Sequence, residues 1–222
     1  MLIRMKTVWR VAAVLMPSFA IATVIGYAVA SLDTGRLDRN GDGLVQTMIV
    51  GDSLAAAFFA TTEEDGFAHL VEEAIGPVEV STTARAHQTL ATVAGVTDVP
   101  SKVEVAVIEL GTNDVGMQTP LTAFQTQYEG LTRAIRAESP RARLVCIGTW
   151  TGWGDMYDRI IEDACVAVDG SYVDAQPLFT EAANRGPVGR ATFVGPGDDF
   201  HPNNAGHRAV ADAVLAVLQS AT

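Results

Sequence analysis

Short apolar runs alternate with longer stretches of amphipathic character along most of this chain. Apolar residues recur at helical spacing over residues 64–75, 84–94, 120–138, 156–168 and 204–219, and residues 54–59 also have helical character. Five apolar runs have the length expected of buried strands, at residues 47–50, 78–80, 103–110, 144–148 and 172–174. Because strands alternate with helices, the pattern predicts an α/β fold. We expect a flavodoxin-like three-layer α/β/α sandwich with a central, mainly parallel five-stranded sheet.

The first 32 residues differ in character from the rest. Three basic residues within the first ten positions precede an uncharged apolar run at residues 11–32, which is long enough to cross a bilayer. The small-residue sequence Ala28-Val29-Ala30 within it is typical of a signal-peptide cleavage site, so both a cleaved signal peptide and an uncleaved membrane anchor stay open. Since the positive charges precede the apolar run, either alternative predicts export of the globular domain that follows. We expect a linker at residues 33–44 and this domain at residues 45–222.

The charge of the chain limits its partners. The formal net charge is −11, and it becomes −14 without the three basic residues of the N-terminal segment. An acidic domain is not attracted to nucleic acid or to anionic lipid, so we expect no nucleic-acid partner.

Two further features concern metals and cysteines. Residues 38–43 match the opening of a calcium-binding loop, but the twelfth loop position falls on Ile49 in a predicted strand. We therefore expect a turn-forming linker and no metal. Cys146 and Cys165 lie in a predicted strand and a predicted helix, where either a disulfide or two separate core residues fit.

Polar residues stand where three of the predicted strands end. Ser53 follows the first strand at a strand-to-helix turn, which exposes a hydroxyl group and aims backbone N–H groups at a bound ligand. Asn113 follows the third strand, and Trp150 and Trp153 lie in the loop after the fourth. In parallel sheets ligands bind at the carboxyl ends of the strands, so Ser53 is a candidate nucleophile within a site at this edge.

A serine nucleophile needs a base, and His201 is the best candidate among the four histidines. It stands in a loop directly before the last predicted helix, and Pro202 biases it toward an extended conformation. Asp198, three residues earlier, can fold back to the imidazole and fix its tautomer while the other nitrogen faces Ser53. The alternative is that His201 only caps the following helix.

Three separated blocks of the chain resemble the SGNH/GDSL hydrolase family of esterases and lipases. Residues 51–54 read Gly-Asp-Ser-Leu, residues 111–114 match Gly-x-Asn-Asp, and residues 198–201 match Asp-x-x-His, in the family's order. The likeness extends from about residue 47 to 219. It implies that residues 45–222 form an SGNH-type hydrolase domain that needs neither a metal nor an organic cofactor.

The resemblance also implies a role for each site residue. Ser53 would be the nucleophile and donate its backbone N–H to the oxyanion, Asn113 would donate its side-chain amide, His201 would act as general base and then acid, and Asp198 would orient His201. The chain departs from the family where a glycine after the second strand usually completes the oxyanion hole. Its best match is Ala86, whose N–H could still be the third donor, and His87 would then lie close to the pocket.

A related fold and several functions stay open. An α/β-hydrolase also uses a serine on a sharp turn, but in the sequence G-x-S-x-G, and here Ala55 replaces the last glycine. The reaction we expect is hydrolysis of a carboxylic ester through an acyl-serine, by an O-acyl esterase on carbohydrate or a short-chain lipid esterase. Trp150 and Trp153 could stack on a sugar ring, face an acyl chain or simply pack in the fold. An acyltransferase and a catalytically silent carbohydrate-binding module are the alternatives, and residues 11–32 could tether the protein to a membrane.

Overall fold

The computed structural model describes residues 37 and 41–220 of the chain. The predicted signal peptide or anchor at residues 1–32 and most of the predicted linker lie outside the described residues. Within residues 41–220, none of the helices combines the length and the hydropathy that a bilayer-spanning segment requires.

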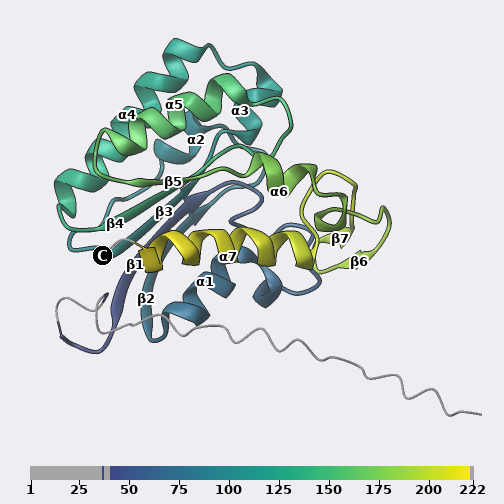
Figure 1. The fold of residues 1–222 in the computed structure, drawn as a ribbon, viewed down its shortest axis with the longest axis horizontal. Coiled ribbons are helices and arrows are strands. Elements are labelled where there is room, and N and C mark those ends of the chain that lie inside the picture. Colours follow the sequence, from purple (N-terminus) through teal and green to yellow (C-terminus); the bar gives the residue numbers. More distant parts are fainter. Residues whose placement is uncertain (1–36, 38–40, 221–222) are drawn as a thin grey trace, which may run out of the picture. The chain divides into compact units, whose positions relative to one another are not determined.

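Five parallel strands form the central sheet, as the alternation of strands and helices predicts. Their order is β2-β1-β3-β4-β5, so the chain changes direction of winding between β1 and β3 (Figure 1). Ligands bind at such a switch point in open α/β sheets. The strands are β1 (Val45–Gly51), β2 (Val78–Ala84), β3 (Val105–Glu109), β4 (Arg143–Ile147) and β5 (Ser171–Val173).

Helices cover both faces of the sheet, which completes the predicted three layers (Figure 1). One face packs against α1 (Phe67–Ile75) and α7 (Asn204–Ser220). The other face packs against α2 (Leu90–Ala94), α4 (Leu121–Glu138) and α5 (Asp155–Val166). Shorter elements connect these layers: η2 (Glu63–Asp65), α3 (Thr112–Met117), α6 (Gln176–Thr180), η3 (Ala182–Asn184), β6 (Ala191–Thr192) and β7 (Gly195–Pro196).

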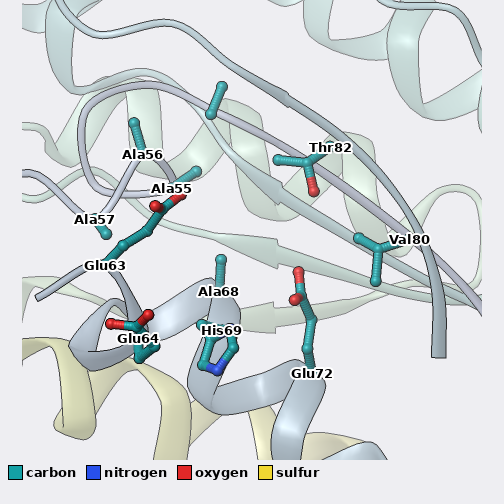
Figure 2. Close-up of a pocket in the computed structure, with 11 residues that line it drawn as sticks. Ala55, Ala56, Ala57, Glu63, Glu64, Ala68, His69, Glu72, Val80 and Thr82 are labelled. Atoms are coloured by element: carbon teal, nitrogen blue, oxygen red, sulfur yellow. The ribbon is translucent and has the colours of Figure 1, made fainter. Parts of the chain in front are cut away.

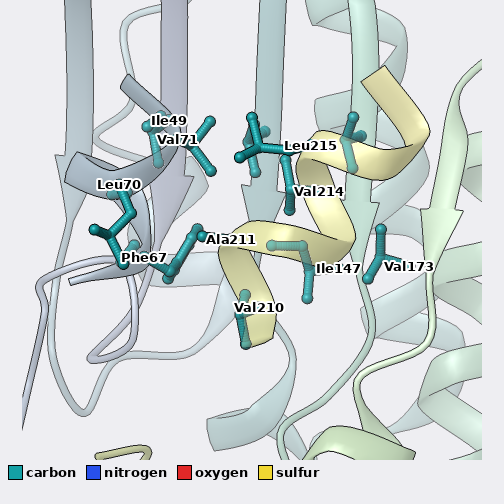
Figure 3. Close-up of a cluster of buried hydrophobic side chains, with 14 of the residues drawn as sticks. Ile49, Phe67, Leu70, Val71, Ile147, Val173, Val210, Ala211, Val214 and Leu215 are labelled. Carbon is teal, nitrogen blue, oxygen red and sulfur yellow. The ribbon is translucent and has the colours of Figure 1, made fainter. Parts of the chain in front are cut away.

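Successive residues of each central strand belong to different cores, because side chains alternate across a strand. In β1, Ile49 packs under α1 and α7, whereas Met48 and Val50 pack on the opposite face. Figure 3 shows the first of these cores, in which Phe67 and Val71 of α1 and Val210 and Val214 of α7 meet the sheet; Ile147 and Val173 belong to the same cluster. Burial on both faces explains why the strands read as continuous apolar runs.

Two predicted helices are wrong in their extent. Residues 84–94 do not form one helix: β2 continues to Ala84, a loop follows, and α2 begins only at Leu90. Residues 54–59 form a series of turns, because Ala57 and Phe59 adopt left-handed φ angles of 56° and 63° that interrupt helical geometry. The backbone N–H of Phe58 accordingly bonds the carbonyl of Ser53, five residues back, at 2.8 Å.

The two cysteines, whose pairing the sequence leaves open, form a disulfide. Cys146 in β4 and Cys165 in α5 are bonded with an S–S distance of 2.07 Å. The bond links the sheet to one of the helices that cover it.

Candidate active site

Ser53 begins the turn that follows β1 and is only 4% exposed. The chain can turn so sharply here because residue 51 is glycine. A Cβ atom at Gly51 would lie 2.4 Å from the Cβ of Ala55 and 2.8 Å from Oε2 of Glu109, which is too close for any side chain. The backbone of β1 therefore passes directly beneath the turn that carries Ser53.

His201 lies beside Ser53, as the sequence predicts. Its Nε2 atom is 3.2 Å from Oγ of Ser53, and its Nδ1 atom is 2.7 Å from Oδ2 of Asp198. The other carboxylate oxygen of Asp198 accepts the backbone N–H groups of Phe200 at 3.1 Å and His201 at 2.8 Å. Asp198 thus fixes both the imidazole and the peptide that carries it, and the structure brings all three predicted residues together.

Burial and hydrogen bonding set the charges of this pair. Burial lowers the pKa of His201 below its ordinary value of 6.5, against the opposing effect of Asp198, so the imidazole is neutral at pH 7. Partial burial acts to raise the pKa of Asp198, but hydrogen bonds from His201 and Phe200 outweigh it, and the pKa lies below its ordinary value. A neutral imidazole held by a charged carboxylate has the protonation state that a general base requires.

Aromatic side chains surround the imidazole of His201. The ring centroid of Phe59 lies 4.6 Å from that of His201, and the ring of Phe200 meets it edge-on at 5.3 Å. Trp150 is completely buried, and its indole N–H donates to the carbonyl of Phe200 at 2.8 Å. Its predicted role as a substrate-binding surface is therefore wrong, since the ring braces the loop before His201 from within the core. Trp153 is 74% exposed and contacts only the edge of Phe179 among aromatic rings of the described chain.

A second histidine, His207 in α7, supports the turn from the other side. It is fully buried; its Nδ1 accepts the N–H of Phe67 at 3.3 Å, and its Nε2 lies 3.0 Å from the carbonyl of Phe58. Burial lowers its pKa to about 4, so the ring is neutral, and Nε2 carries the proton that it donates to Phe58. Both ring nitrogens of His207 thus have hydrogen-bond partners within the core.

Asn113 stands at the start of α3, directly after β3. Gly111 before it has a φ of 133°, a conformation that favours glycine. The amide Nδ2 of Asn113 donates to Oδ2 of Asp52 at 2.9 Å and to the carbonyl of Gln88 at 3.1 Å. Both amide hydrogens have protein acceptors here, so donation to a substrate oxygen requires that one of these bonds be shared or exchanged.

The loop between β2 and α2 brings Ala86 and His87 to the same edge. The N–H of Gln88 bonds the carbonyl of Arg85, and His87 adopts a left-handed φ of 61°. The conformation that suits glycine thus falls on His87, one residue after Ala86. The His87 ring meets that of Phe58 edge-on at 6.0 Å, and its nearness contributes to lowering the pKa of His201. The third oxyanion donor within this loop stays a prediction.

Two carboxyl groups are buried near Ser53: Asp52 belongs to the Gly-Asp-Ser-Leu block, whereas Glu109 belongs to none of the three sequence blocks. Asp52 and Glu109 have exposures of 0% and 1%, and Glu109 contacts the turn itself. A signal was present, because Glu109 is an acidic residue near the end of an apolar strand, where charges are rarely buried without a partner.

A hollow of about 620 Å³ lies on the side of the turn that faces α1 and β2. Figure 2 shows Glu63, Glu64, His69 and Glu72 around it, beneath the small side chains of residues 55–57. Ser53, Asn113 and His201 are not among the residues that line it, so it is separate from the candidate site. No group of three histidine, cysteine or acidic side chains within residues 41–220 is arranged to hold a metal ion.

The family of the chain is decided by comparison with known proteins. A model of the GDSL-like lipase/acylhydrolase family matches residues 49–209, which include Ser53, Asn113 and His201. The chain belongs to this family. The resemblance carried by the three sequence blocks is thereby confirmed. No curated protein sequence matches the chain.

Solved structures of a carbohydrate esterase, a phospholipase and an acyltransferase share this fold at low sequence identity. A carbohydrate esterase family 2 enzyme with a carbohydrate-binding domain from Corynascus thermopiles (Myceliophthora fergusii) is 17% identical, with a TM-score of 0.61 over 79% of this chain and 66% of that one. Phospholipase A1 from Streptomyces albidoflavus is 16% identical, with a TM-score of 0.61 over 78% and 99%. A salicylyl-acyltransferase from a tetracycline biosynthetic pathway is 15% identical, with a TM-score of 0.59 over 80% and 56%. At these identities the likeness establishes the α/β fold of the GDSL hydrolase and leaves its substrate open.

Proposed function

We propose that this GDSL hydrolase cleaves carboxylic esters through an acyl-serine intermediate. The observation that carries the proposal is the hydrogen-bonded series from Ser53 Oγ through His201 to Asp198. As Ser53 Oγ attacks the ester carbonyl carbon, its proton passes to Nε2 of His201 and the carbonyl π electrons move to the oxygen. His201 then gives this proton to the departing alkoxide, and an acyl-serine ester is left. A water molecule, deprotonated by His201, releases the acid and restores Ser53.

The negative oxygen formed during attack needs hydrogen-bond donors. We assign this role to the backbone N–H of Ser53, the side-chain amide of Asn113 and one N–H of the loop that holds Ala86 and His87. A donor aimed at a developing oxyanion contributes about 3–4 kcal/mol to lowering the barrier. Asp198 contributes indirectly, by holding His201 in the tautomer that faces Ser53.

The substrate class that we propose is an ester with a short acyl group, on carbohydrate or on a short-chain lipid alcohol. Phe59 and Phe200 flank the imidazole that protonates the leaving alcohol, and exposed Trp153 lies in the loop after β4. Aromatic faces suit both sugar rings and apolar chains. A panel of p-nitrophenyl esters of increasing chain length and of acetylated sugars, tested on the domain without residues 1–32, distinguishes a carbohydrate ester from a lipid ester as the substrate.

We also propose that the enzyme acts outside the cytoplasm, either secreted or tethered by residues 11–32. Support comes from the basic residues before the apolar run and from the Cys146–Cys165 disulfide, since disulfides persist in oxidising compartments. Fractionation of cells that produce the full chain tests this: we expect enzyme in the membrane or extracellular fraction. Activity confined to the cytosol would contradict it.

Ser53→Ala tests the reaction itself. We expect it to abolish turnover of p-nitrophenyl acetate and covalent labelling by a fluorophosphonate, because the attacking oxygen is lost. Ser81→Ala, on an exposed serine of β2, is the matched control and should change neither. Undiminished turnover by Ser53→Ala would remove the assignment, and a folded wild-type chain that neither turns over nor labels would favour a silent binding module.

An acyltransferase would use the same acyl-serine and pass the acyl group to a second alcohol. The partition is measured by following free acid and acylated product while a sugar acceptor is added. For a hydrolase we expect release of free acid to dominate at every acceptor concentration.

A further inference from the structure

Two carboxyl groups lie buried beneath the turn that carries Ser53. Glu109 is the last residue of β3, and it is paired in register with Gly51, the last residue of β1. Asp52 comes next after Gly51, so the two acidic residues meet where the two central strands end. Both are buried, with exposures of 0% and 1%.

The Glu109 side chain binds the backbone of the turn. Its Oε2 atom accepts the N–H of Asp52 at 3.1 Å and the N–H of Ala55 at 3.3 Å. The same atom occupies the space that a Cβ at Gly51 would need. Glu109 therefore supplies acceptors for two N–H groups that have no regular helix to join, because the turn is irregular.

The Asp52 side chain connects this support to the reacting groups. Its Oδ1 accepts the N–H of Leu54 at 3.3 Å and lies 3.3 Å from Oγ of Ser53, so it is a second acceptor for the hydroxyl proton that otherwise faces Nε2 of His201. Its Oδ2 accepts the amide of Asn113 at 2.9 Å. One carboxylate thus contacts both the proposed nucleophile and the proposed oxyanion donor.

We propose that Glu109 is a positioning residue of this active site, whose carboxyl group holds the Ser53 turn directly and the Asn113 amide through Asp52. The inference rests on the proposed ester hydrolysis for its kinetic consequences. It goes beyond the three sequence blocks, since Glu109 belongs to none of them.

Burial disfavours the charged form of both carboxyl groups. Burial, together with the charge of Asp52, raises the pKa of Glu109 well above its ordinary value. Burial also raises the pKa of Asp52, to about 6, but the hydrogen bond between the two side chains lowers the pKa of Asp52 and raises that of Glu109. Glu109 therefore holds a proton more strongly than Asp52 does, and a proton shared by the pair lies on Glu109, which leaves the charge on the side chain that accepts the Asn113 amide. A neutral amide at position 109 can make the same contacts.

Three substitutions at position 109 test this role by steady-state kinetics on p-nitrophenyl acetate. Glu109→Gln keeps a carbonyl oxygen for the two N–H groups and an N–H donor for Asp52, so we expect kcat within about threefold of wild type. Glu109→Leu removes every polar contact at similar volume, and we expect kcat to fall about 100-fold while KM changes less than threefold. Glu109→Asp withdraws the carboxyl by one methylene group, and we expect a fall of about tenfold.

Glu104→Leu is the matched control. Glu104 is also a buried glutamate, directly before β3, and it accepts the N–H of Gln46 at 3.0 Å at the opposite end of the sheet. We expect this variant to lose stability, as Glu109→Leu does, but to keep the kcat of wild type. If kcat falls equally in Glu109→Leu and Glu104→Leu, Glu109 contributes only to stability and the proposal is wrong. A Glu109→Gln enzyme as impaired as Glu109→Leu would also overturn the proposal, and the Gln and Asp variants decide if Glu109→Leu does not fold.

A readout without turnover separates this proposal from the proposed function. Infrared spectra of the wild-type protein at pH 7 should contain the C=O band of a buried protonated carboxylic acid, and Glu109→Gln should remove it. Crystal structures should retain the Asn113–Asp52 contact in the Gln variant and show it broken in the Asp or Leu variant. If wild type proves inactive but these changes appear, ester hydrolysis fails and the positioning role stands. Absence of the band would overturn the assignment of the proton to Glu109, and an unmoved Asn113 in the Asp and Leu variants defeats the positioning role.

Discussion

Nε2 of His201 lies 3.2 Å from Oγ of Ser53, although 148 positions separate the two residues in the chain. The contact exists because the last loop before α7 returns to the edge where β1 ends, and because Trp150 and Asp198 hold that loop from two sides.

Neighbouring aspartates in the loop before His201 should differ sharply in importance. Asp198→Asn removes the charge that faces Nδ1 of His201, and we expect kcat/KM to fall about 10³-fold or more, because the amide favours the wrong tautomer. Asp199 contributes its backbone carbonyl to Arg185 at 2.9 Å, so Asp199→Asn should stay within about twofold of wild type. Steady-state kinetics on one p-nitrophenyl ester compares them. Similar losses in both variants would contradict the orientation seen here.

Asn113→Ala should act on the chemical step. We expect kcat to fall about 10²–10³-fold with KM within about threefold, because the amide is needed most when the oxyanion forms. Asn204→Ala is a matched control, since that side chain accepts the N–H of Thr61 at 2.8 Å away from the proposed oxyanion hole. If Asn113→Ala instead raised KM and spared kcat, the residue would bind ground-state substrate only.

The pH dependence should follow the neutral form of His201. Because burial holds the pKa of this imidazole below 6.5, the base stays deprotonated to a more acidic pH than free histidine would. We expect kcat/KM to rise with pH through a midpoint below 6.5. A midpoint at pH 7 or above, measured with a substrate that does not titrate, would exclude His201 as the group that controls the rate.

Loss of the disulfide should weaken the fold and spare the reaction. Replacing Cys146 and Cys165 together by alanine releases a closed loop between positions 19 residues apart, and we expect the free energy of unfolding to fall by about 3 kcal/mol. Urea unfolding gives this value, and kcat should change less than twofold because neither sulfur contacts the site. Reductant should produce a similar decrease in wild type and none in the double variant. If reductant leaves the free energy of unfolding of wild type unchanged, and two free thiols can be titrated before reduction, the disulfide does not form.

The sequence predicts the sheet and the location of the site well for a physical reason. Strands buried on both faces must be continuously apolar, so Ile49 and Val107 mark their strands without tertiary information. The Asp198–His201 pair is local in sequence and visible as a pattern. Its meeting with Ser53 follows from the rule that ligands bind at the carboxyl ends of parallel strands.

Other features depend on contacts that a local pattern does not encode. The alanine-rich residues after Ser53 favour a helix by propensity, but Ala57 and Phe59 adopt left-handed φ angles, and Ala57 packs closely against the backbone of Gly66. The sequence pattern does not distinguish the two tryptophans of the loop after β4, yet Trp150 is buried and Trp153 is exposed. The hydrogen bonds of Glu109 with the turn depend on the register of β3 against β1, and the sequence of neither strand alone specifies this register.

The burial of Trp150 gives the protein a built-in optical reporter. Its indole N–H is bound to the peptide just before His201, so any displacement of that loop changes the polarity around the ring. Emission from this tryptophan should therefore shift when the loop moves, before the rest of the fold melts. Trp153, already in water, would hardly respond.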